Sequence, residues 1–342
     1  MSAPLRRGPG PLKAMLSVII PTRDRQDFLR AALVSLRHQT LPLQAFEILV
    51  VDNGSTDGTR PMVQALVTEM ANLHYLHEPE PGLHAGRHRG LLAARGDILV
   101  FADDDIEAEP TWLAAIAEGF VDPSVAMMGG NNLPLFLAPP PAWLLALWHR
   151  SPAEGGLALP TLSILQLPGP LRPISPFYVW GCNFAIRKSL LVEAGGFHPD
   201  GMPRELIRFR GDGETHIARF VAAAGMKCLF HPAATIHHKV TPERMTLGYF
   251  HQRGFNQGVS DSYTTLREGI NQPQPLWTLP SRLARGVGRR LEAAWVKLCC
   301  PQAVRRARAE EWAGYREGYA FHQDAYRTDP AVRAWVHKPT YL

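Results

Sequence analysis

Short apolar runs alternate with segments of helical periodicity over the first hundred residues of the chain. The apolar runs are rich in Val, Ile, Leu and Phe and have the length of buried strands, whereas the segments between them place apolar side chains on one helical face. The expected strands are residues 16–21, 46–51, 73–76 and 97–102, and the expected helices are residues 27–38, 59–70 and 86–94. This βαβ series predicts an α/β protein with a Rossmann-like, mostly parallel sheet and helices on both of its faces.

Acidic residues directly follow two of these strands. Asp52 comes after the strand at 46–51, and Asp103 comes after the strand at 97–102. Ligands of parallel sheets bind at the carboxyl ends of the strands, which lie along one edge of the sheet. We therefore expect a single cleft that holds both Asp52 and Asp103.

The composition of the sequence changes after residue 130. Residues 131–176 are rich in proline and contain one short apolar helix at 143–148, so we interpret them as an excursion over the cleft. Regular structure is expected to return with a helix at 214–224 and a strand at 227–231. The expected organisation is a flexible N-terminus (1–14), a main α/β domain (15–241) and a helical, basic C-terminal extension (242–342).

Composition restricts the class of protein. The hydrophobic content of 46% and the charged content of 20% are typical of a packed rather than a disordered chain. The four cysteines show no paired metal-ligand spacing and are too few for a disulfide scaffold, so a cytoplasmic environment is expected. No stretch reaches the roughly 18 apolar residues that cross a bilayer, and the N-terminus lacks the apolar run of a signal peptide.

The acidic triplet Asp103, Asp104 and Asp105 is the strongest candidate for chemistry. Three adjacent carboxylates repel one another, and a bound Mn²⁺ or Mg²⁺ would relieve that repulsion while bridging to a diphosphate. Alternate residues of an extended segment share a face, so Asp103 and Asp105 are expected to point together and Asp104 away from them. An acidic loop or a helix N-cap is the alternative, because so short a motif has little specificity by itself.

Other motifs accompany the triplet in a fixed order and spacing. They are Ser-Val-Ile-Ile-Pro-Thr-Arg-Asp-Arg at 17–25, Val-Asp-Asn-Gly-Ser-Thr-Asp-Gly-Thr at 51–59, Gly-Arg-His-Arg-Gly at 86–90 and Phe-Ala-Asp-Asp-Asp at 101–105. Together they closely resemble the inverting glycosyltransferase family 2, whose members have a GT-A fold. The resemblance covers roughly residues 15–260, and it implies that the main domain is a GT-A catalytic domain.

The resemblance implies a role for each matching residue. The implied nucleotide contacts are Pro21, Thr22, Arg25, Asp52, Arg87 and Asp103. Asp103 would lie nearer the ribose, and Asp105 would bind the metal. The chain departs from the family at His88, where Asn is usual, which puts any contact from that position in doubt. The segment Trp-Gly-Cys-Asn-Phe-Ala-Ile-Arg at 180–187 resembles the part of the family that lies beside the sugar and the acceptor, which implicates Trp180, Gly181 and Asn183. Cys182 in this segment is interpreted as structural.

An inverting transfer needs a carboxylate that deprotonates the acceptor hydroxyl. The family usually provides it from a Glu-Asp pair at a helix start, where this chain has Asp212 and Glu214. The helical phase favours Glu214, because Ile217 and Val221 then take the buried positions. Matching the spacing of the acids instead selects Asp212, whose alternative role is an N-cap. We favour Glu214 slightly and keep both.

His231, His237 and His238 cluster near the end of a strand. The family pattern fits His238, which makes it a candidate third metal ligand beside Asp103 and Asp105, and it fits Arg244 as a phosphate contact. A structural histidine is the alternative for His238.

The net charge of +5 is concentrated at the C-terminal end. Residues 241–342 carry 15 Lys and Arg against 9 Asp and Glu. Apolar residues recur at helical spacing between basic ones at 276–298, which suits a helix lying on an anionic membrane surface. A helix that packs on the catalytic domain or on a second subunit of a homodimer is the alternative, and it is slightly favoured.

These observations predict a metal-dependent glycosyltransferase that transfers a sugar from a nucleoside-diphosphate sugar, with a UDP-sugar expected, to a hydroxyl of a glycan or lipid-linked acceptor. A nucleotidyltransferase is an alternative, but it would need a Gly-rich phosphate loop after the first strand, where this chain has Pro-Thr-Arg-Asp-Arg. A non-enzymatic binding module built on the basic tail is a second alternative. Nucleic acid is not an expected partner, because acidic residues share the cleft. The expected location is cytoplasmic, with peripheral contact at the inner face of a membrane.

Overall fold

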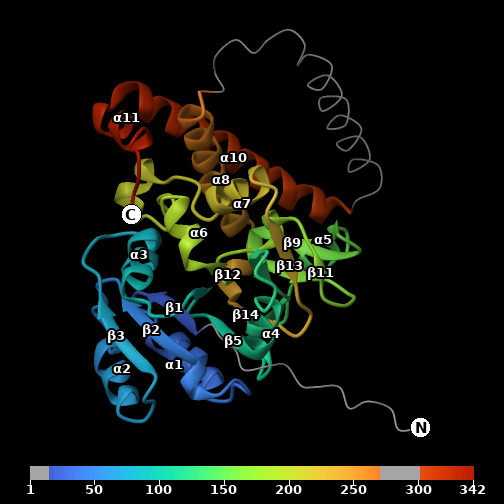
Figure 1. Cartoon of the computed structure of the whole chain (residues 1–342). Helices are drawn as coiled ribbons and strands as arrows, with labels where there is room; N and C mark the ends of the chain where they lie inside the picture. Colours follow the sequence, from blue (N-terminus) through green and yellow to red (C-terminus); the bar gives the residue numbers. More distant parts are fainter. Residues whose placement is uncertain (1–14, 270–300) are drawn as a thin grey trace.

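The computed structural model describes residues 15–269 and 301–342, and it contains two β-sheets flanked by helices (Figure 1). The first sheet contains, in spatial order, β11 (Arg172–Pro173), β13 (Lys227–Phe230), β6 (Val125–Gly129), β12 (Asn183–Arg187), β4 (Ile98–Ala102), β1 (Leu16–Thr22), β2 (Phe46–Asp52) and β3 (Leu73–His77). Neighbouring strands from β3 to β4 are parallel, and β12 runs antiparallel to both β4 and β6. The predicted mixed, mostly parallel sheet is confirmed.

Side chains of the central strands point alternately into two separate cores, because successive residues of a strand face opposite sides of the sheet. Val18 and Ile20 of β1 pack on one side, in the core that also holds side chains of three helices, α1 (Gln26–Leu36), α2 (Thr59–Val67) and α4 (Trp112–Gly119). Ile19 packs on the other side, with α3 (Leu83–Ala93), α6 (Lys188–Glu193) and α7 (Thr215–Ala223). Helices therefore cover both faces, as predicted.

The second sheet is smaller and is built largely from the proline-rich segment. Its strands, in spatial order, are β5 (Ile106–Ala108), β14 (Ile236–Val240), β7 (Asn132–Phe136), β10 (Ile164–Gln166), β9 (Gly156–Leu159) and β8 (Pro152–Ala153). The pairing of β14 with β5 sets His238 opposite Ile106, the residue that follows the acidic triplet. This register places His238 beside the acidic triplet.

Residues 131–176 therefore differ from the irregular excursion that the prolines suggested. Apart from the helix α5 (Ala142–Trp148), the segment forms β7 to β10 of the second sheet and β11 of the first. Pro152 lies in β8 and Pro173 in β11, each at the outer edge of its sheet, where the missing N–H leaves no ladder hydrogen bond broken. Ser163, which follows η2 (Pro160–Leu162), is the part of this segment that reaches the candidate site described below.

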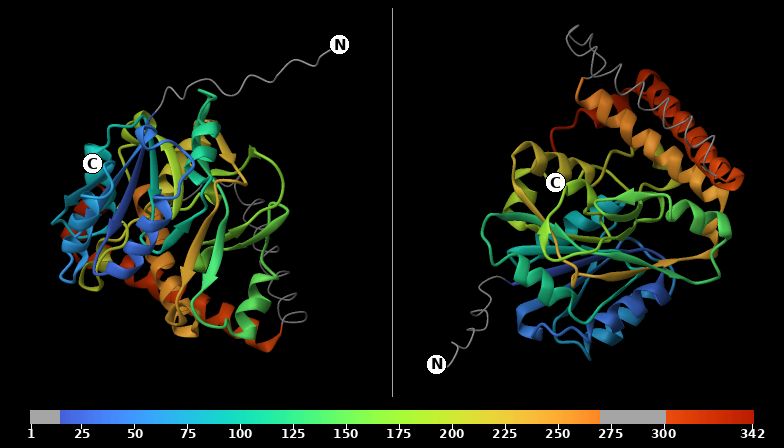
Figure 2. Two further views of the ribbon diagram at one scale, coloured as in Figure 1. Left: turned by 90° about the horizontal axis from the view of Figure 1, so that it is seen from below. Right: turned by 90° about the vertical axis from the view of Figure 1, so that its right-hand side faces the viewer.

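The C-terminal extension consists of α8 (Leu247–Arg267), α10 (Gln302–Thr328) and α11 (Pro330–Val336). The long helices α8 and α10 lie side by side (Figure 2). Glycines line their contact, namely Gly254 and Gly258 on α8 and Gly314 and Gly318 on α10. A Cβ atom at any of the four would overlap backbone atoms of the opposite helix, so only glycine permits this close approach. The predicted helical extension is confirmed.

The basic, apolar-periodic residues at 276–298 lie outside the described residues, so the membrane-surface helix stays a prediction. None of the helices in residues 15–269 and 301–342 combines the length and the apolar character that crossing a bilayer requires.

The close helix contact generates a prediction about stability. Gly258→Ala should lower the free energy of unfolding by about 1–3 kcal/mol, because the new methyl group meets the carbonyl of Tyr315 and forces the helices apart. The matched control is Gly248→Ala in the first turn of α8, where the nearest atom to a new Cβ is Thr246 Oγ1 at 4.0 Å. The control should be neutral or stabilising by up to about 1 kcal/mol. Urea unfolding midpoints check this, and equal midpoints for the two variants would contradict the packing.

Candidate active site

The acidic triplet begins at the end of β4, and its three members differ in exposure. The side chain of Asp103 is 35% exposed, whereas those of Asp104 and Asp105 are 6% and 2% exposed. Burial, together with the charge of Asp105, raises the pKa of Asp103. Two buried carboxylates beside a third need positive groups around them, and three side chains from different elements provide these.

Asp105 is surrounded by cationic or potentially cationic groups. Its Oδ2 accepts hydrogen bonds from Arg25 Nη2 at 2.8 Å and from Arg244 Nη2 at 2.7 Å, and its Oδ1 lies 3.3 Å from His238 Nε2. Burial opposes ionisation of Asp105, but the nearby His238 and the charges of Arg244 and Arg25 lower its pKa below the usual range. Asp105 is therefore ionised.

Asp104 has a different environment. Its Oδ2 accepts from the Thr22 hydroxyl at 2.7 Å, and its Oδ1 lies 3.2 Å from Arg25 Nε. Burial outweighs the attraction of Arg25 and raises the pKa of Asp104 to about 7. Near neutral pH this carboxyl is thus close to half protonated.

A group able to hold a metal ion is formed by Asp103, Asp105 and His238. One ligand atom from each lies within 4.8 Å of the other two, the one such group found in residues 15–269 and 301–342. Asp105 Oδ1 and His238 Nδ1 are buried and have no hydrogen-bond partner. Two carboxylates and an imidazole form a donor set that divalent cations accept, and an unpartnered buried oxygen fits the presence of a ligand. The residues present therefore fit a divalent cation.

A cavity of about 550 Å³ opens beside the triplet. The residues predicted from the sequence that line it are Pro21, Thr22, Arg25, Asp103, Asp105 and Arg244. The lining residues that sequence reasoning missed are Arg23, Asn53, Gly82, Leu83, Gly201, Pro203 and Glu205. Arg23 and Asn53 lie within the quoted motifs at 17–25 and 51–59 and could have been suspected, whereas residues 201–205 carry no recognisable pattern.

Asp52 lies next to this cavity but is buried. Its Oδ1 accepts from the backbone N–H of Ser55 at 2.8 Å, and its Oδ2 accepts from the Tyr75 hydroxyl at 2.8 Å. Burial and this bond raise the pKa of Tyr75 to about 12. Asp52 thus shapes the turn after β2, and each of its oxygens keeps one lone pair for a further contact.

A second, smaller cavity of about 170 Å³ shares Asp103 with the first. Glu214, the residue before α7, lines it, with Oε2 3.3 Å from Arg87 Nη1 and Oε1 accepting from the backbone N–H of Gly181 at 3.3 Å. Arg87 is buried and also approaches Asp103 at 3.9 Å, so it lies between the two carboxylates. A Cβ at Gly181 would overlap the Arg87 guanidinium, which explains glycine at this position.

Asp212 also reaches the smaller cavity, but its oxygens are engaged elsewhere. Oδ1 lies 2.6 Å from His198 Nδ1, and Oδ2 accepts from Arg219 and from the Thr264 hydroxyl. The helix start therefore places two acids differently: Asp212 joins α7 to α8, and Glu214 faces the cavity.

Three residues of the 180–187 segment have different surroundings. Gly181 lines the smaller cavity, whereas Trp180 donates from Nε1 to the Phe177 carbonyl and lines neither cavity. Asn183 differs from expectation: it is buried, accepts from Trp112 Nε1 at 2.9 Å and donates to the Ala234 carbonyl at 2.9 Å. With these partners its amide joins β12 to α4 and to the loop before β14, so we remove it from the sugar contacts. Burial raises the pKa of Cys182 well above its usual value, in keeping with a structural thiol.

The other histidines singled out in the sequence do not join the site. His88 accepts a hydrogen bond from the backbone N–H of Phe197 at 2.8 Å, and burial lowers its pKa to about 4. His231 lies 3.5 Å from Glu118, and His237 lies 2.7 Å from Glu109. His88 thus supports the loop beneath Arg87 rather than contacting a ligand.

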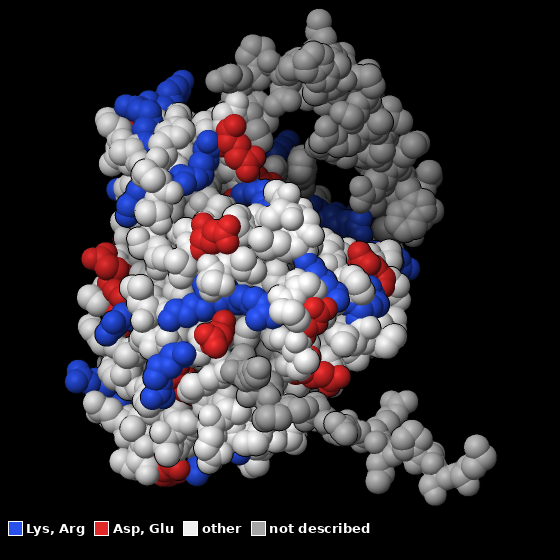
Figure 3. All heavy atoms as spheres, viewed as in Figure 1, with Lys and Arg blue, Asp and Glu red and all other residues white. Residues whose placement is uncertain are grey.

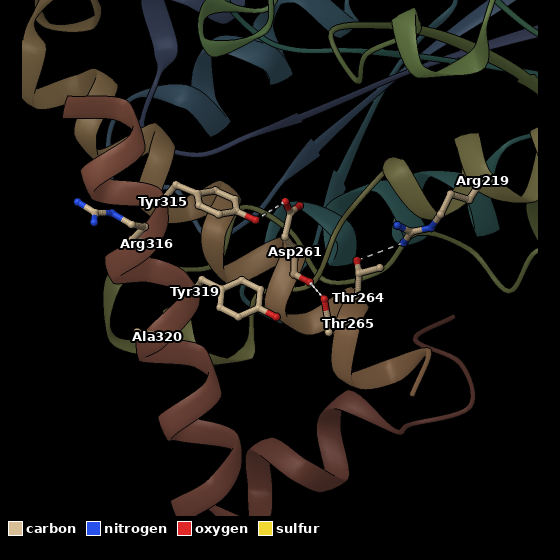
Figure 4. Close-up of a pocket in the computed structure, with 8 residues that line it drawn as sticks. All are labelled: Arg219, Asp261, Thr264, Thr265, Tyr315, Arg316, Tyr319 and Ala320. Atoms are coloured by element: carbon tan, nitrogen blue, oxygen red, sulfur yellow. Dashed lines mark hydrogen bonds between the residues drawn. The ribbon is translucent and has the colours of Figure 1, made fainter. Parts of the chain in front are cut away.

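A third hollow of about 580 Å³ lies among α7, α8 and α10, and none of the residues predicted from the sequence lines it (Figure 4). Arg219 borders it and donates to Thr264, while Tyr315 donates to Asp261 at 3.0 Å. On the face that Figure 3 shows, basic and acidic side chains are interspersed rather than gathered in one patch.

Comparisons with known proteins identify the family of the chain. The model of the family described as glycosyl transferase family 2 matches residues 17–193, just over half of the chain. The glycosyltransferase AglE of Haloferax volcanii is 36% identical over 117 residues, which cover 34% of this chain and 38% of that protein. The pre-mycofactocin glycosyltransferase of Mycobacterium tuberculosis is 28% identical over 190 residues, which cover 55% of this chain and 36% of that protein.

The matched segments span well under half of the length of these curated relatives. Among solved structures, a mannosyltransferase of Pyrobaculum calidifontis in complex with GDP-Man and Mn²⁺ is similar with a TM-score of 0.53 and 20% identity, covering 94% of this chain and 85% of that one. This likeness confirms the GT-A type of fold. Because the family model covers more than half of the chain, the protein belongs to glycosyl transferase family 2.

Proposed function

We propose that the protein transfers a sugar from a nucleoside-diphosphate sugar to an acceptor hydroxyl, with inversion and with the help of a divalent cation. The observation that carries the proposal is that Asp103 lines two cavities, one with the arginines and the candidate metal group, the other with Glu214. A donor in the larger cavity and an acceptor in the smaller one would meet beside Asp103. Family membership favours this function over a nucleotidyltransferase or a non-enzymatic binding module.

The larger cavity has the chemistry to bind a diphosphate. Arg23, Arg25 and Arg244 line it, and guanidinium groups bind phosphate oxygens through charge-assisted hydrogen bonds. Asp103, Asp105 and His238 would hold the cation, whose charge would stabilise the leaving diphosphate. The imidazole in the donor set favours Mn²⁺ over Mg²⁺. A UDP-sugar is the donor predicted from the sequence, and the GDP-mannose in the Pyrobaculum structure makes it the second donor to test.

Glu214 is the proposed general base. It is half-buried and lines the smaller cavity, where Arg87 and the Gly181 N–H orient its carboxylate. An ionised carboxylate at that place can take the proton of an acceptor hydroxyl as it attacks from the side opposite the diphosphate. Asp212 is less suited, because Arg219, His198 and Thr264 already use its oxygens.

The function as a whole is tested by donor hydrolysis. Purified protein incubated with UDP-sugars and GDP-mannose should release a nucleoside diphosphate slowly from one of them, and only when Mn²⁺ or Mg²⁺ is present. Chromatography of the nucleotides measures this release. Pyrophosphate release from a nucleoside triphosphate and a sugar phosphate, with the nucleoside-diphosphate sugars left intact, would instead favour the nucleotidyltransferase.

The metal assignment predicts opposite results for two neighbouring substitutions. Asp105→Asn should weaken Mn²⁺ binding at least about tenfold, because it removes an ionised ligand. Asp104→Asn should have little effect, because that carboxyl is outside the metal group and already close to half protonated near neutral pH. Calorimetric titration with Mn²⁺ alone measures the Mn²⁺ affinity of the two variants. An unchanged affinity in Asp105→Asn would contradict the proposed metal site.

The base assignment predicts a second contrast. Glu214→Gln should still bind donor and cation but lose transfer by about 10²–10⁴-fold, the usual contribution of a general base. Asp212→Asn should lower the unfolding midpoint, because it weakens the contacts with Arg219 and His198, while the folded protein keeps transferring. Single-turnover transfer and donor titrations separate the effects. Full activity of Glu214→Gln would show that another group is the base.

A further inference from the structure

One part of the wall of the smaller cavity comes from α8. Arg253, Gln257 and Ser260 line the cavity, and their spacing of four and three residues puts them on one face of the helix. Arg210 reaches the same wall and donates from Nε to the Ser260 hydroxyl at 3.1 Å. None of these residues belongs to a motif quoted from the sequence, so the motifs do not explain why polar and basic side chains line this wall.

The acids that line this cavity already have cationic partners. Asp200 lies 2.6 Å from Arg210 Nη2, and the charges of Arg210 and Arg87 lower its pKa although burial raises it. Asp212 is paired with Arg219, and Glu214 with Arg87. Asp103, the remaining one, belongs to the candidate metal group. Each carboxylate of the cavity therefore already has a cationic partner or belongs to the candidate metal group, although the charge of Arg253 also acts on Asp200.

Arg253 is a further cation of this cavity. In the part of the chain that the structure describes, its guanidinium makes no ion pair, and its Nε is buried without a hydrogen-bond partner. Glu311 on α10 lies near enough to interact with its charge but is hydrogen-bonded by Thr161 instead. A partly buried guanidinium that makes no direct ion pair is costly, and an anion that binds to it reduces the cost.

We propose that the smaller cavity binds an acceptor that carries an anionic oxygen group, a phosphate or a carboxylate, and that Arg253 binds this group. The inference rests on the proposed function, since it names the class of acceptor that would present its hydroxyl to Glu214. Gln257 lies one turn further along α8 and lines the same cavity. A volume of about 170 Å³ suits the anionic end of a molecule whose remainder extends out of the cavity.

Binding of inorganic phosphate to the full chain tests the proposal, without donor and with EDTA present. The wild-type protein should bind phosphate, and Arg253→Gln should weaken that binding about tenfold or more, the equivalent of one charge-assisted hydrogen bond. Arg253→Lys should weaken it by a smaller factor, because the charge remains. Arg316→Gln on α10, outside the cavity, is the matched control and should bind as the wild type does.

A merely structural role for Arg253 is excluded by a second measurement. Arg253→Gln should unfold at nearly the same urea concentration as the wild type, because the guanidinium makes no ion pair in the described residues and its Nε has no hydrogen-bond partner. Phosphate binding that is absent from the wild type, insensitive to Arg253→Gln, or lost in Arg244→Gln instead would overturn the proposal, the last by placing phosphate in the donor cavity. Failure of the proposed function is distinguishable, since it would show as absent donor hydrolysis while phosphate binding still depended on Arg253.

Discussion

The structure depends on the compensation of negative charge that is buried at the end of β4. Asp104 and Asp105 are almost inaccessible to water, and an ionised carboxylate in that position is tolerated only with cations or hydrogen-bond donors around it. These come from separate elements: Arg25 follows β1, His238 belongs to β14 of the second sheet, and Arg244 belongs to η5 (Pro242–Met245). The site therefore forms only when both sheets and the start of the C-terminal region are in place. A divalent cation and a diphosphate would bind where arginine and histidine side chains already compensate the charge of the carboxylates.

The first half of this arrangement could be predicted from the sequence, because its signals are local. A buried strand followed by acids is contiguous in the chain, and the position of Asp103 at the edge of a parallel sheet follows from fold rules alone. The counter-charges could not be predicted in the same way. Arg244 contacts Asp105 across 139 residues of sequence, and only the family resemblance suggested that it lies there. Arg253 and Arg210 belong to no quoted motif, so only the structure shows that they line the smaller cavity.

The ambiguity between Asp212 and Glu214 has the same origin. Both acids lie at one helix start, so helical phase and motif spacing could each select one of them. What separates them is tertiary: His198, Arg219 and Thr264 engage Asp212, while Arg87 and the Gly181 N–H hold Glu214 towards the cavity. For Asn183 a motif was misleading. It suggested contact with the sugar, whereas in the structure the side-chain amide accepts a hydrogen bond from Trp112 and donates one to Ala234. The strands of residues 131–176 were missed because they are two to five residues long and contain proline, so their periodicity is too short to detect.

The pairing of α8 with α10 connects the C-terminal region to the chemistry. One stripe of α8 carries the glycines that allow α10 to approach, and the neighbouring stripe carries Arg253, Gln257 and Ser260. Because the glycine contact joins the two backbones directly, it fixes the position of α8 more firmly than long side chains would. That position sets the distance between the α8 wall and Glu214, and so the size of the acceptor that the smaller cavity admits. The C-terminal helices thus act as one wall of the candidate acceptor site, and substitutions on the far side of α10 would reach the site through this contact rather than through charge.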